Sequence, residues 1–179
     1  AGATVGSEFR VNTRTHGSQY YSSVITLSDG GWLIAWMSEG QDGSGSGIYG
    51  QRYNNAGAAV GIEFRVNTVT FGEQLYPSVT ALSDGGWLVT WMSDGQDGSG
   101  YGIYGQRYNS AGSSVESEFR VNTFTAGSQE YPSVTTLADG GWLVTWVSNG
   151  QDGSIGGVYA QRYNIAGATV GSEFRVNTT

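Results

Sequence analysis

The chain of 179 residues contains no cysteine and no lysine, and it has only two prolines and one histidine, His16. Without cysteine it can form neither a disulfide framework nor a thiolate site. Its eight basic residues are therefore all arginines, against fifteen acidic residues, and its formal net charge is -7. Because nucleic-acid binding needs a clustered basic surface, this composition predicts no nucleic-acid partner.

Long apolar runs are also missing. None approaches the roughly 20 residues that a membrane helix needs, so we expect no membrane insertion. Apolar residues show no helical periodicity over any helix-length window, whereas glycine is frequent, with 30 copies, and 38% of the residues are hydrophobic. The composition predicts an ordered all-β protein with many turns.

A repeat organises the chain. The hexapeptide EFRVNT begins at Glu8, Glu63, Glu118 and Glu173, so successive copies lie 63 − 8 = 55 residues apart. Repeats of this length are typical of solenoids, propellers and tandem arrays. We interpret residues 1–179 as a single repeat domain. It divides into a surplus outer strand within 1–13 and three units at 14–68, 69–123 and 124–179.

Each unit contains four strand candidates separated by turn residues. In the second unit these are Ser78–Leu82, Gly86–Met92, Gly102–Asn109 and Glu118–Thr123. The second strand carries apolar side chains on both faces, which predicts that it is covered on both sides. The fourth strand alternates apolar and polar residues, as a half-exposed outer strand does. The predicted order from axis to rim is therefore the chain order, with the tryptophans in the core.

Four short antiparallel strands per unit are typical of a propeller blade. The predicted fold is all-β and β-propeller-like, with three four-stranded antiparallel blades; the alternative is a β-prism or β-trefoil with internal threefold symmetry. Three blades would leave two apolar faces bare. We therefore expect self-association, either as a dimer completing a six-bladed ring or as a longer array.

The succession YPSV, DGGWLVTW, DGQDGSG, YGQRY and EFRVNT resembles the tandem repeats of very large secreted bacterial proteins. These include hemolysin-type calcium-binding proteins and surface adhesins. The resemblance covers essentially the whole chain. It implies propeller-like blades in a protein that is extracellular or lies at the cell surface.

The acidic loop DGQDGSG, residues 94–100, suggests calcium, because Asp94 and Asp97 could supply carboxylate ligands. Ca²⁺ is thus the one cofactor that the sequence suggests. However, the lead residue varies among the units, as Glu39, Asp94 and Asn149. Asp-Gly pairs also form turns without metal. The loop aspartates are therefore either turn caps or repeated ligand contacts: Asp42, Asp97 and Asp152.

A second candidate site lies in the segments that lead from one unit's outer strand to the next unit's inner strand. Thr, Gly, Gln and Tyr recur there at matched positions among varying neighbours, which is typical of a binding rim. The glutamines are Gln19, Gln74 and Gln129, and the tyrosines are Tyr21, Tyr76 and Tyr131.

No acid and base pair stands out, and threefold repetition suits multivalent binding better than catalysis. We therefore expect a noncatalytic extracellular binding module, carbohydrate-binding or adhesive, whose partner is a glycan or a cell-surface ligand. The alternative is a structural repeat or filament subunit of a large bacterial surface protein.

Overall fold

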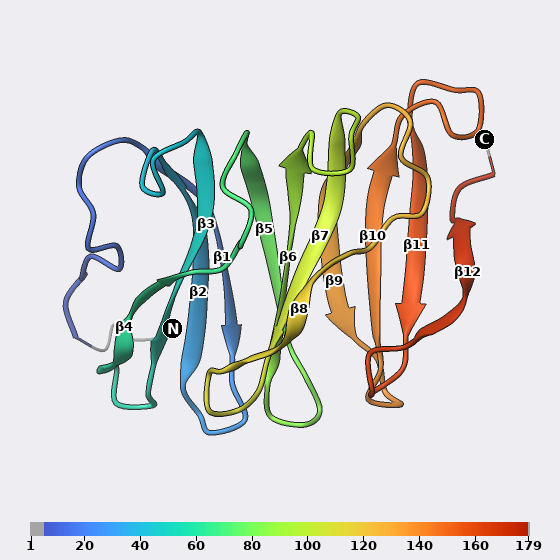
Figure 1. Cartoon of the computed structure of the whole chain (residues 1–179). Helices are drawn as coiled ribbons and strands as arrows, with labels where there is room; N and C mark the ends of the chain where they lie inside the picture. The colour runs from blue at the N-terminus through green and yellow to red at the C-terminus, as the bar shows by residue number, and fades with distance from the viewer. Residues whose placement is uncertain (1–5, 179) are drawn as a thin grey trace.

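The computed structural model describes residues 6–178, which form three four-stranded antiparallel sheets, one for each repeat (Figure 1). We call these sheets blades 1, 2 and 3. Blade 1 contains β1 (Gln19–Thr26), β2 (Trp32–Glu39), β3 (Ser46–Tyr53) and β4 (Ala59–Arg65). Blade 2 contains β5 (Gln74–Ala81), β6 (Trp87–Asp94), β7 (Tyr101–Tyr108) and β8 (Ser114–Arg120). Blade 3 contains β9 (Gln129–Thr136), β10 (Trp142–Ser148), β11 (Gly157–Tyr163) and β12 (Thr169–Arg175).

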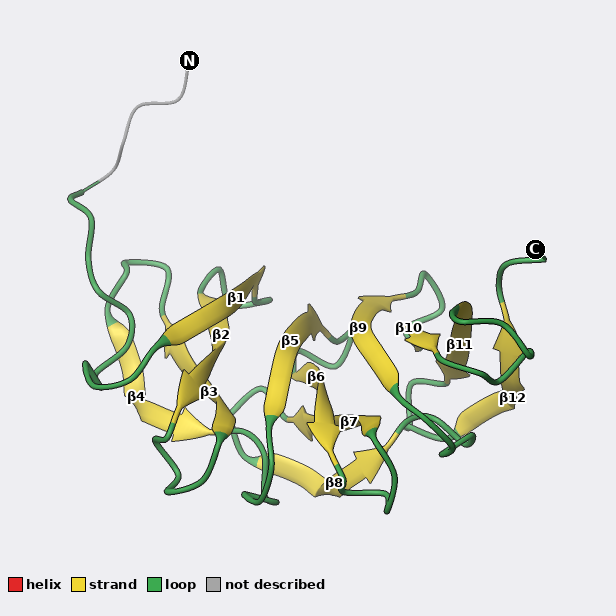
Figure 2. Ribbon diagram, turned by 90° about the horizontal axis from the view of Figure 1, so that it is seen from above, coloured by secondary structure: helices red, strands yellow, loops and turns green. Residues whose placement is uncertain are grey.

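The blades form an open arc (Figure 2). The inner strands β1, β5 and β9 lie on the concave side, where β1 contacts β5 and β5 contacts β9, while β4, β8 and β12 lie on the convex side. The predicted all-β, propeller-like fold and its strand order are confirmed. The arc is not a closed threefold unit, so the β-prism and β-trefoil alternatives do not apply. No helix within residues 6–178 is long and apolar enough to cross a bilayer.

The core lies between neighbouring blades. We call the face of a blade that is turned to the following blade its leading face, and the opposite one its trailing face. Between blades 1 and 2, the core joins leading-face residues Leu33, Met37 and Ile48 to trailing-face residues Trp87, Val89 and Trp91. Between blades 2 and 3 the same positions meet as Leu88, Met92 and Ile103 with Trp142, Val144 and Trp146. In blade 2 the second strand, β6, is apolar on both faces, and each face packs against a different blade.

The outer strand differs from the prediction. In blade 2 it ends at Arg120 rather than Thr123, although the Val121 backbone N–H still donates to the Ile103 carbonyl at 2.8 Å. The cause is Asn122, whose Oδ1 accepts a hydrogen bond from the Ile103 backbone N–H at 2.7 Å while its amide donates to the Phe124 carbonyl at 2.8 Å. From residue 122 this buried side chain takes the place of backbone pairing, and the chain continues toward β9.

The surplus outer strand was also predicted wrongly. Residues 6–13 form no strand, and residues 1–5 lie outside the described part of the chain. This segment lies against blade 1, where the Phe9 ring packs 5.5 Å from that of Tyr53 and the Thr13 backbone N–H donates to Glu63 at 2.6 Å. It occupies the position of a preceding blade's outer segment, but no third strand is there for it to pair with.

Candidate functional site

Each inner strand has a β-bulge near its start. The register between β1 and β2 shifts between Tyr20 and Ser23, and equivalent shifts occur in the other two blades. Each bulge holds a tyrosine in the left-handed region, with φ angles of 53°, 53° and 56° for Tyr21, Tyr76 and Tyr131. Glycine is the usual residue at such a position because a Cβ atom is strained there.

A second bulge, between the third and fourth strands, shows how the fold handles the same strain elsewhere. Its left-handed position holds Gly61 in blade 1, Glu116 in blade 2 and Gly171 in blade 3. Two of the three copies thus use glycine, whereas all three inner bulges keep tyrosine. Left-handed non-glycine residues are destabilising by about 1–3 kcal/mol and gather at functional sites. The tyrosines are therefore candidates for a function other than building the turn.

The three tyrosines form one aromatic surface at the inner edge of the arc. The rings of Tyr21 and Tyr76 lie 4.2 Å apart, and those of Tyr76 and Tyr131 lie 4.9 Å apart, nearly edge to face. Tyr21 and Tyr131 are 51% and 54% exposed, and Tyr76 is half-buried between them. The hydroxyls of Tyr21 and Tyr76 are hydrogen-bonded at 3.2 Å, and this bond raises the pKa of Tyr21.

The predicted glutamines lie two residues before the tyrosines in sequence, and Gln19 is half-buried. Gln74 and Gln129 are fully buried. The Gln74 Oε1 accepts from the Asn67 amide at 3.0 Å, and the Gln74 amide donates to the Phe71 carbonyl at 2.9 Å. Gln19 likewise accepts from the Asn12 amide, at 3.1 Å. The glutamines therefore hold the connecting segments in place, and the surface of Gln74 and Gln129 is not accessible to a ligand.

The loop aspartates have local partners. One carboxylate oxygen of each accepts the backbone N–H of the serine two residues later, at 3.2 Å for Asp42 and Asp97 and 3.0 Å for Asp152. Asp152 also forms an ion pair with Arg175 at 3.1 Å. These contacts are those of turn caps. A ligand contact by the aspartates stays a prediction.

A calcium site at Asp94 and Asp97 also stays a prediction. Across residues 6–178, no group of three or more histidine, cysteine, aspartate or glutamate side chains is placed to hold a metal ion. The Asp97 carboxylate lies against Gly102 at the start of β7, and a Cβ atom at Gly102 would come within 2.8 Å of its Oδ2. Burial, followed by the charge of Asp97, raises the pKa of the neighbouring Tyr104 to about 12.

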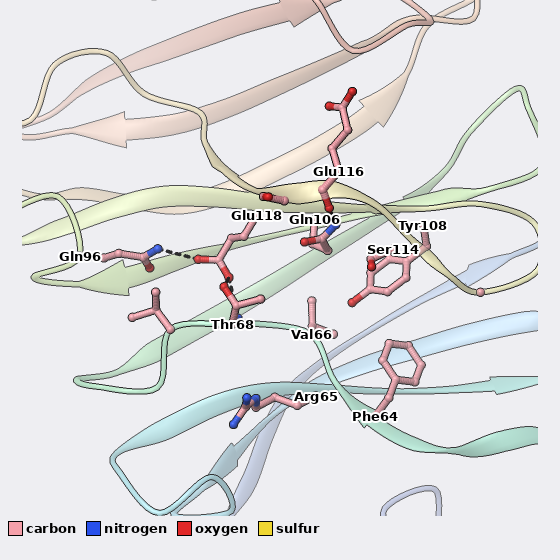
Figure 3. Close-up of a pocket in the computed structure, with 13 residues that line it drawn as sticks. Phe64, Arg65, Val66, Thr68, Gln96, Gln106, Tyr108, Ser114, Glu116 and Glu118 are labelled. Carbon is pink, nitrogen blue, oxygen red and sulfur yellow. Dashed lines mark hydrogen bonds between the residues drawn. The ribbon is translucent and has the colours of Figure 1, made fainter.

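A cavity of about 740 Å³ lies at the rim between blades 1 and 2, lined by residues that include Phe64, Tyr108 and Glu118 (Figure 3). One oxygen of Glu118 accepts from the Gln96 amide at 2.6 Å, and the other accepts from the Thr68 backbone N–H at 2.6 Å and its hydroxyl at 2.9 Å. Glu63 and Glu173 make the same bonds in their blades. Both carboxylate oxygens are thus engaged, and we call this contact between blades the seam.

Sequence reasoning did not single out the seam, nor Tyr20, whose ring lies 6.0 Å from that of Tyr21. The seam residues recur in every unit, but so do many core residues, so recurrence alone does not separate them. Tyr20 is replaced by Leu75 and Glu130 in the other units, so nothing in the repeat marks it.

No family model matches the chain, and no curated protein sequence does. Solved structures with a similar fold exist. An endo-arabinase from Bacteroides thetaiotaomicron VPI-5482 is 14% identical over 95% of this chain and 66% of that chain, with a TM-score of 0.63. An endo-1,4-beta-xylanase from the same organism is 14% identical over 92% of this chain and 63% of that chain, with a TM-score of 0.58. A thermostable family-43 glycoside hydrolase is 13% identical over 93% of this chain and 63% of that chain, with a TM-score of 0.57.

This chain therefore spans just under two thirds of the length of each of these proteins. At such low identities the likeness establishes the fold alone. In architecture, the three blades are similar to part of these glycoside hydrolases.

Proposed function

We propose that this chain is a noncatalytic carbohydrate-binding module whose ligand lies on Tyr21, Tyr76 and Tyr131. The observation that carries the proposal is the retention of tyrosine in the left-handed region at all three inner bulges. A purely structural bulge would be more stable with glycine, which the fold uses at two of the three equivalent outer positions.

Carbohydrates suit this surface. The C–H faces of a sugar ring pack on aromatic rings, and its hydroxyls exchange hydrogen bonds with phenol hydroxyls. The tyrosines form a continuous row across three blades rather than three separate pockets. An extended oligosaccharide or polysaccharide, with several sugars in contact at once, fits such a row better than a monosaccharide.

The absence of catalysis is part of the proposal. Glu63, Glu118 and Glu173 are engaged in seams. Three further carboxylates form ion pairs with arginines of the same blade: Asp29, Asp84 and Asp139. An acid or base catalyst needs a carboxyl group free to reach the substrate, and these side chains are held elsewhere.

The proposed location is extracellular or at the cell surface, where an adhesive role is also compatible with binding to glycans. Its support is the resemblance of the repeat to those of secreted bacterial proteins. A metal is not needed for stacking on tyrosine, although calcium bound by the loops could add to it.

The test is affinity electrophoresis in gels containing arabinan or xylan, which the names of the similar enzymes suggest, together with a glycan array with and without chelator. Tyr76→Ala and Tyr131→Ala should lose most of the retardation. Phe71→Ala is the matched control, because Phe71 is 56% exposed but lies outside the tyrosine row. The triple variant of Asp42, Asp97 and Asp152 to Asn should bind normally if these aspartates are only turn caps, and should bind more weakly if they contact the ligand.

Lack of binding to every glycan in both conditions would refute the carbohydrate proposal. Equal losses for Phe71→Ala and Tyr131→Ala would remove the tyrosines as its site. Release of reducing sugars from either polysaccharide by the purified chain would show that the protein is an enzyme.

A further inference from the structure

The two ends of the arc carry uncovered apolar faces, and the two faces are of different kinds. On the trailing face of blade 1, Val24 is 65% exposed, whereas the equivalent Val79 and Val134 are 7% and 8% exposed. On the leading face of blade 3, Val158 is 38% exposed, whereas the equivalent Ile103 is fully buried. In blade 2 both faces are covered: its trailing face packs on the leading face of blade 1, and its leading face packs on the trailing face of blade 3. These two contacts show which kind of face each uncovered end of the arc can bind.

An arginine on each leading face packs on a tryptophan of the following blade. The guanidinium of Arg52 lies 5.5 Å from the Trp87 ring centre, and that of Arg107 lies 4.8 Å from the Trp142 ring centre. Both also donate to a carbonyl in the turn after the following blade's third strand, at 2.9 and 3.0 Å. The contact therefore combines a cation–π interaction with a charge-assisted hydrogen bond.

The same two residue types are present at the ends of the arc without this contact. Arg162 pairs with Asp139 of its own blade, but its side chain is 44% exposed. Trp32 is half-buried, while Trp87 and Trp142 are 1% exposed. Within residues 6–178, the only arginines placed over tryptophan rings are Arg52 and Arg107.

An aromatic contact follows the same rule. Phe64 packs 5.6 Å from Tyr108, and Phe119 packs 5.9 Å from Tyr163, each from a leading face onto the next blade. Phe174, at the end of blade 3, is 48% exposed. Its expected target, Tyr53 on blade 1, is contacted instead by Phe9 of the surplus EFRVNT copy.

We propose that a second copy of this chain docks head to tail, with its blade 3 leading face on the blade 1 trailing face. Arg162 then lies over Trp32 of the other copy, and Phe174 takes the place of Phe9 on Tyr53. A cavity of about 490 Å³ on this face is lined by Tyr20, Val24 and Trp36 and by residues 9–12, which must move to admit the apolar side chains of the incoming face. This contact repeats the packing between blades 1 and 2 and between blades 2 and 3, and it is independent of the carbohydrate proposal.

Two features oppose this docking and make it reversible. The first is the surplus EFRVNT copy, in which Phe9 must leave Tyr53 and Thr13 must leave Glu63. The second is Ile155, which is 92% exposed and stands where blades 1 and 2 have Gly45 and Gly100. A Cβ atom at Gly45 would come within 2.7 Å of the Gly72 carbonyl oxygen of the next blade, so the Ile155 loop must shift when the copies meet.

The test is sedimentation velocity of the full chain over a concentration series, from low micromolar to millimolar. Phe174→Ala and Arg162→Ala should each weaken association by about tenfold, the usual range for a buried aromatic or cation–π contact. Phe9→Ala and Ile155→Gly should each strengthen it by a similar factor. The control is Ile62→Ala, which removes an 87% exposed side chain on β4, away from both faces, and should change nothing.

Phe9→Ala is expected to strengthen association and Phe174→Ala to weaken it. The test is therefore specific, because a general loss of stability would change the association of both variants in the same direction. Circular dichroism of each variant verifies folding. A Phe9→Ala, Ile155→Gly double variant that stays monomeric at the highest concentration would overturn the proposal. So would association that Phe174→Ala and Arg162→Ala leave unchanged.

The size of the assembly decides between the two forms of self-association expected from the sequence. A limit at two copies supports a ring of six blades closed by two identical contacts. Continued growth with concentration overturns ring closure and supports a filament built from the same contacts, as a structural repeat would form.

Discussion

Replacing Tyr131 by glycine should leave the protein more stable than replacing it by alanine. Both changes remove the same ring and therefore the same contact with Tyr76. They differ in the backbone, because residue 131 has a φ of 56° and a Cβ atom is strained there. The comparison thus isolates the strain that carries the proposed function.

The magnitude follows from two opposing effects. A left-handed conformation is unfavourable by about 1–2 kcal/mol for a residue with a Cβ atom. Glycine removes this cost, but it also makes the unfolded chain more flexible, which lowers the stability of the glycine variant by about 0.4–1 kcal/mol. The glycine variant should therefore exceed the alanine variant by about 0.5–1 kcal/mol in free energy of unfolding.

Urea denaturation followed by tryptophan fluorescence measures this difference. With a slope of about 2 kcal/mol per molar, the midpoint of the glycine variant should lie about 0.3–0.5 M higher. Thr135, an exposed residue on the same strand with no positive φ, provides the control, where alanine should be the more stable substitution. A Tyr131→Gly variant that is no more stable than Tyr131→Ala would refute the assignment of strain to this bulge.

Three further outcomes are expected. Glu116→Gly should raise the free energy of unfolding by about 0.5–1 kcal/mol in urea, since the equivalent bulges hold Gly61 and Gly171, and Glu116→Ala should not. Asn122→Ala should lower the free energy of unfolding by about 3 kcal/mol by leaving buried partners unsatisfied, and Asn177→Ala should lower it less because Asn177 is only half-buried. Burial raises the pKa of Tyr104 to about 12 and the pKa of Tyr108 and Tyr163 further, so their contribution to stability is complete below pH 10 and is lost above it. Alkaline titration by tyrosine absorbance should show this loss as ionisation that coincides with unfolding.

Strand order could be predicted because one strand type is apolar on both faces. Trp87 and Leu88 point to opposite sides of β6, and each is buried against a different blade. A strand covered twice must lie between neighbours, which places the half-polar EFRVNT strand outside it. The 55-residue period predicts three sheets, one for each full repeat, and this prediction needs no information about how the sheets contact one another.

Strand ends and backbone strain could not be predicted in this way. The alternation of Phe119 and Val121 continues past Arg120, but the strand ends because the Asn122 side chain bonds the backbone of Ile103 on β7 and of Phe124 two residues further on. Nothing in the sequence marks Tyr131 as left-handed, since that conformation follows from the one-residue shift between β9 and β10. Recurrence in every unit marks the tyrosines in the sequence, whereas their positive φ angles are visible only in the structure.

The seam has a consequence for how such a chain can change in length. Glu118 accepts hydrogen bonds from Thr68 of the preceding unit and from Gln96 of its own, and Thr123 donates in turn to Glu173 of the next unit, so every unit has the same partners to offer on both sides. Insertion or deletion of one whole unit would leave the remaining contacts between neighbours unaltered. Duplication of the gene segment in register with the repeat would therefore yield a foldable product at once, without compensating substitutions.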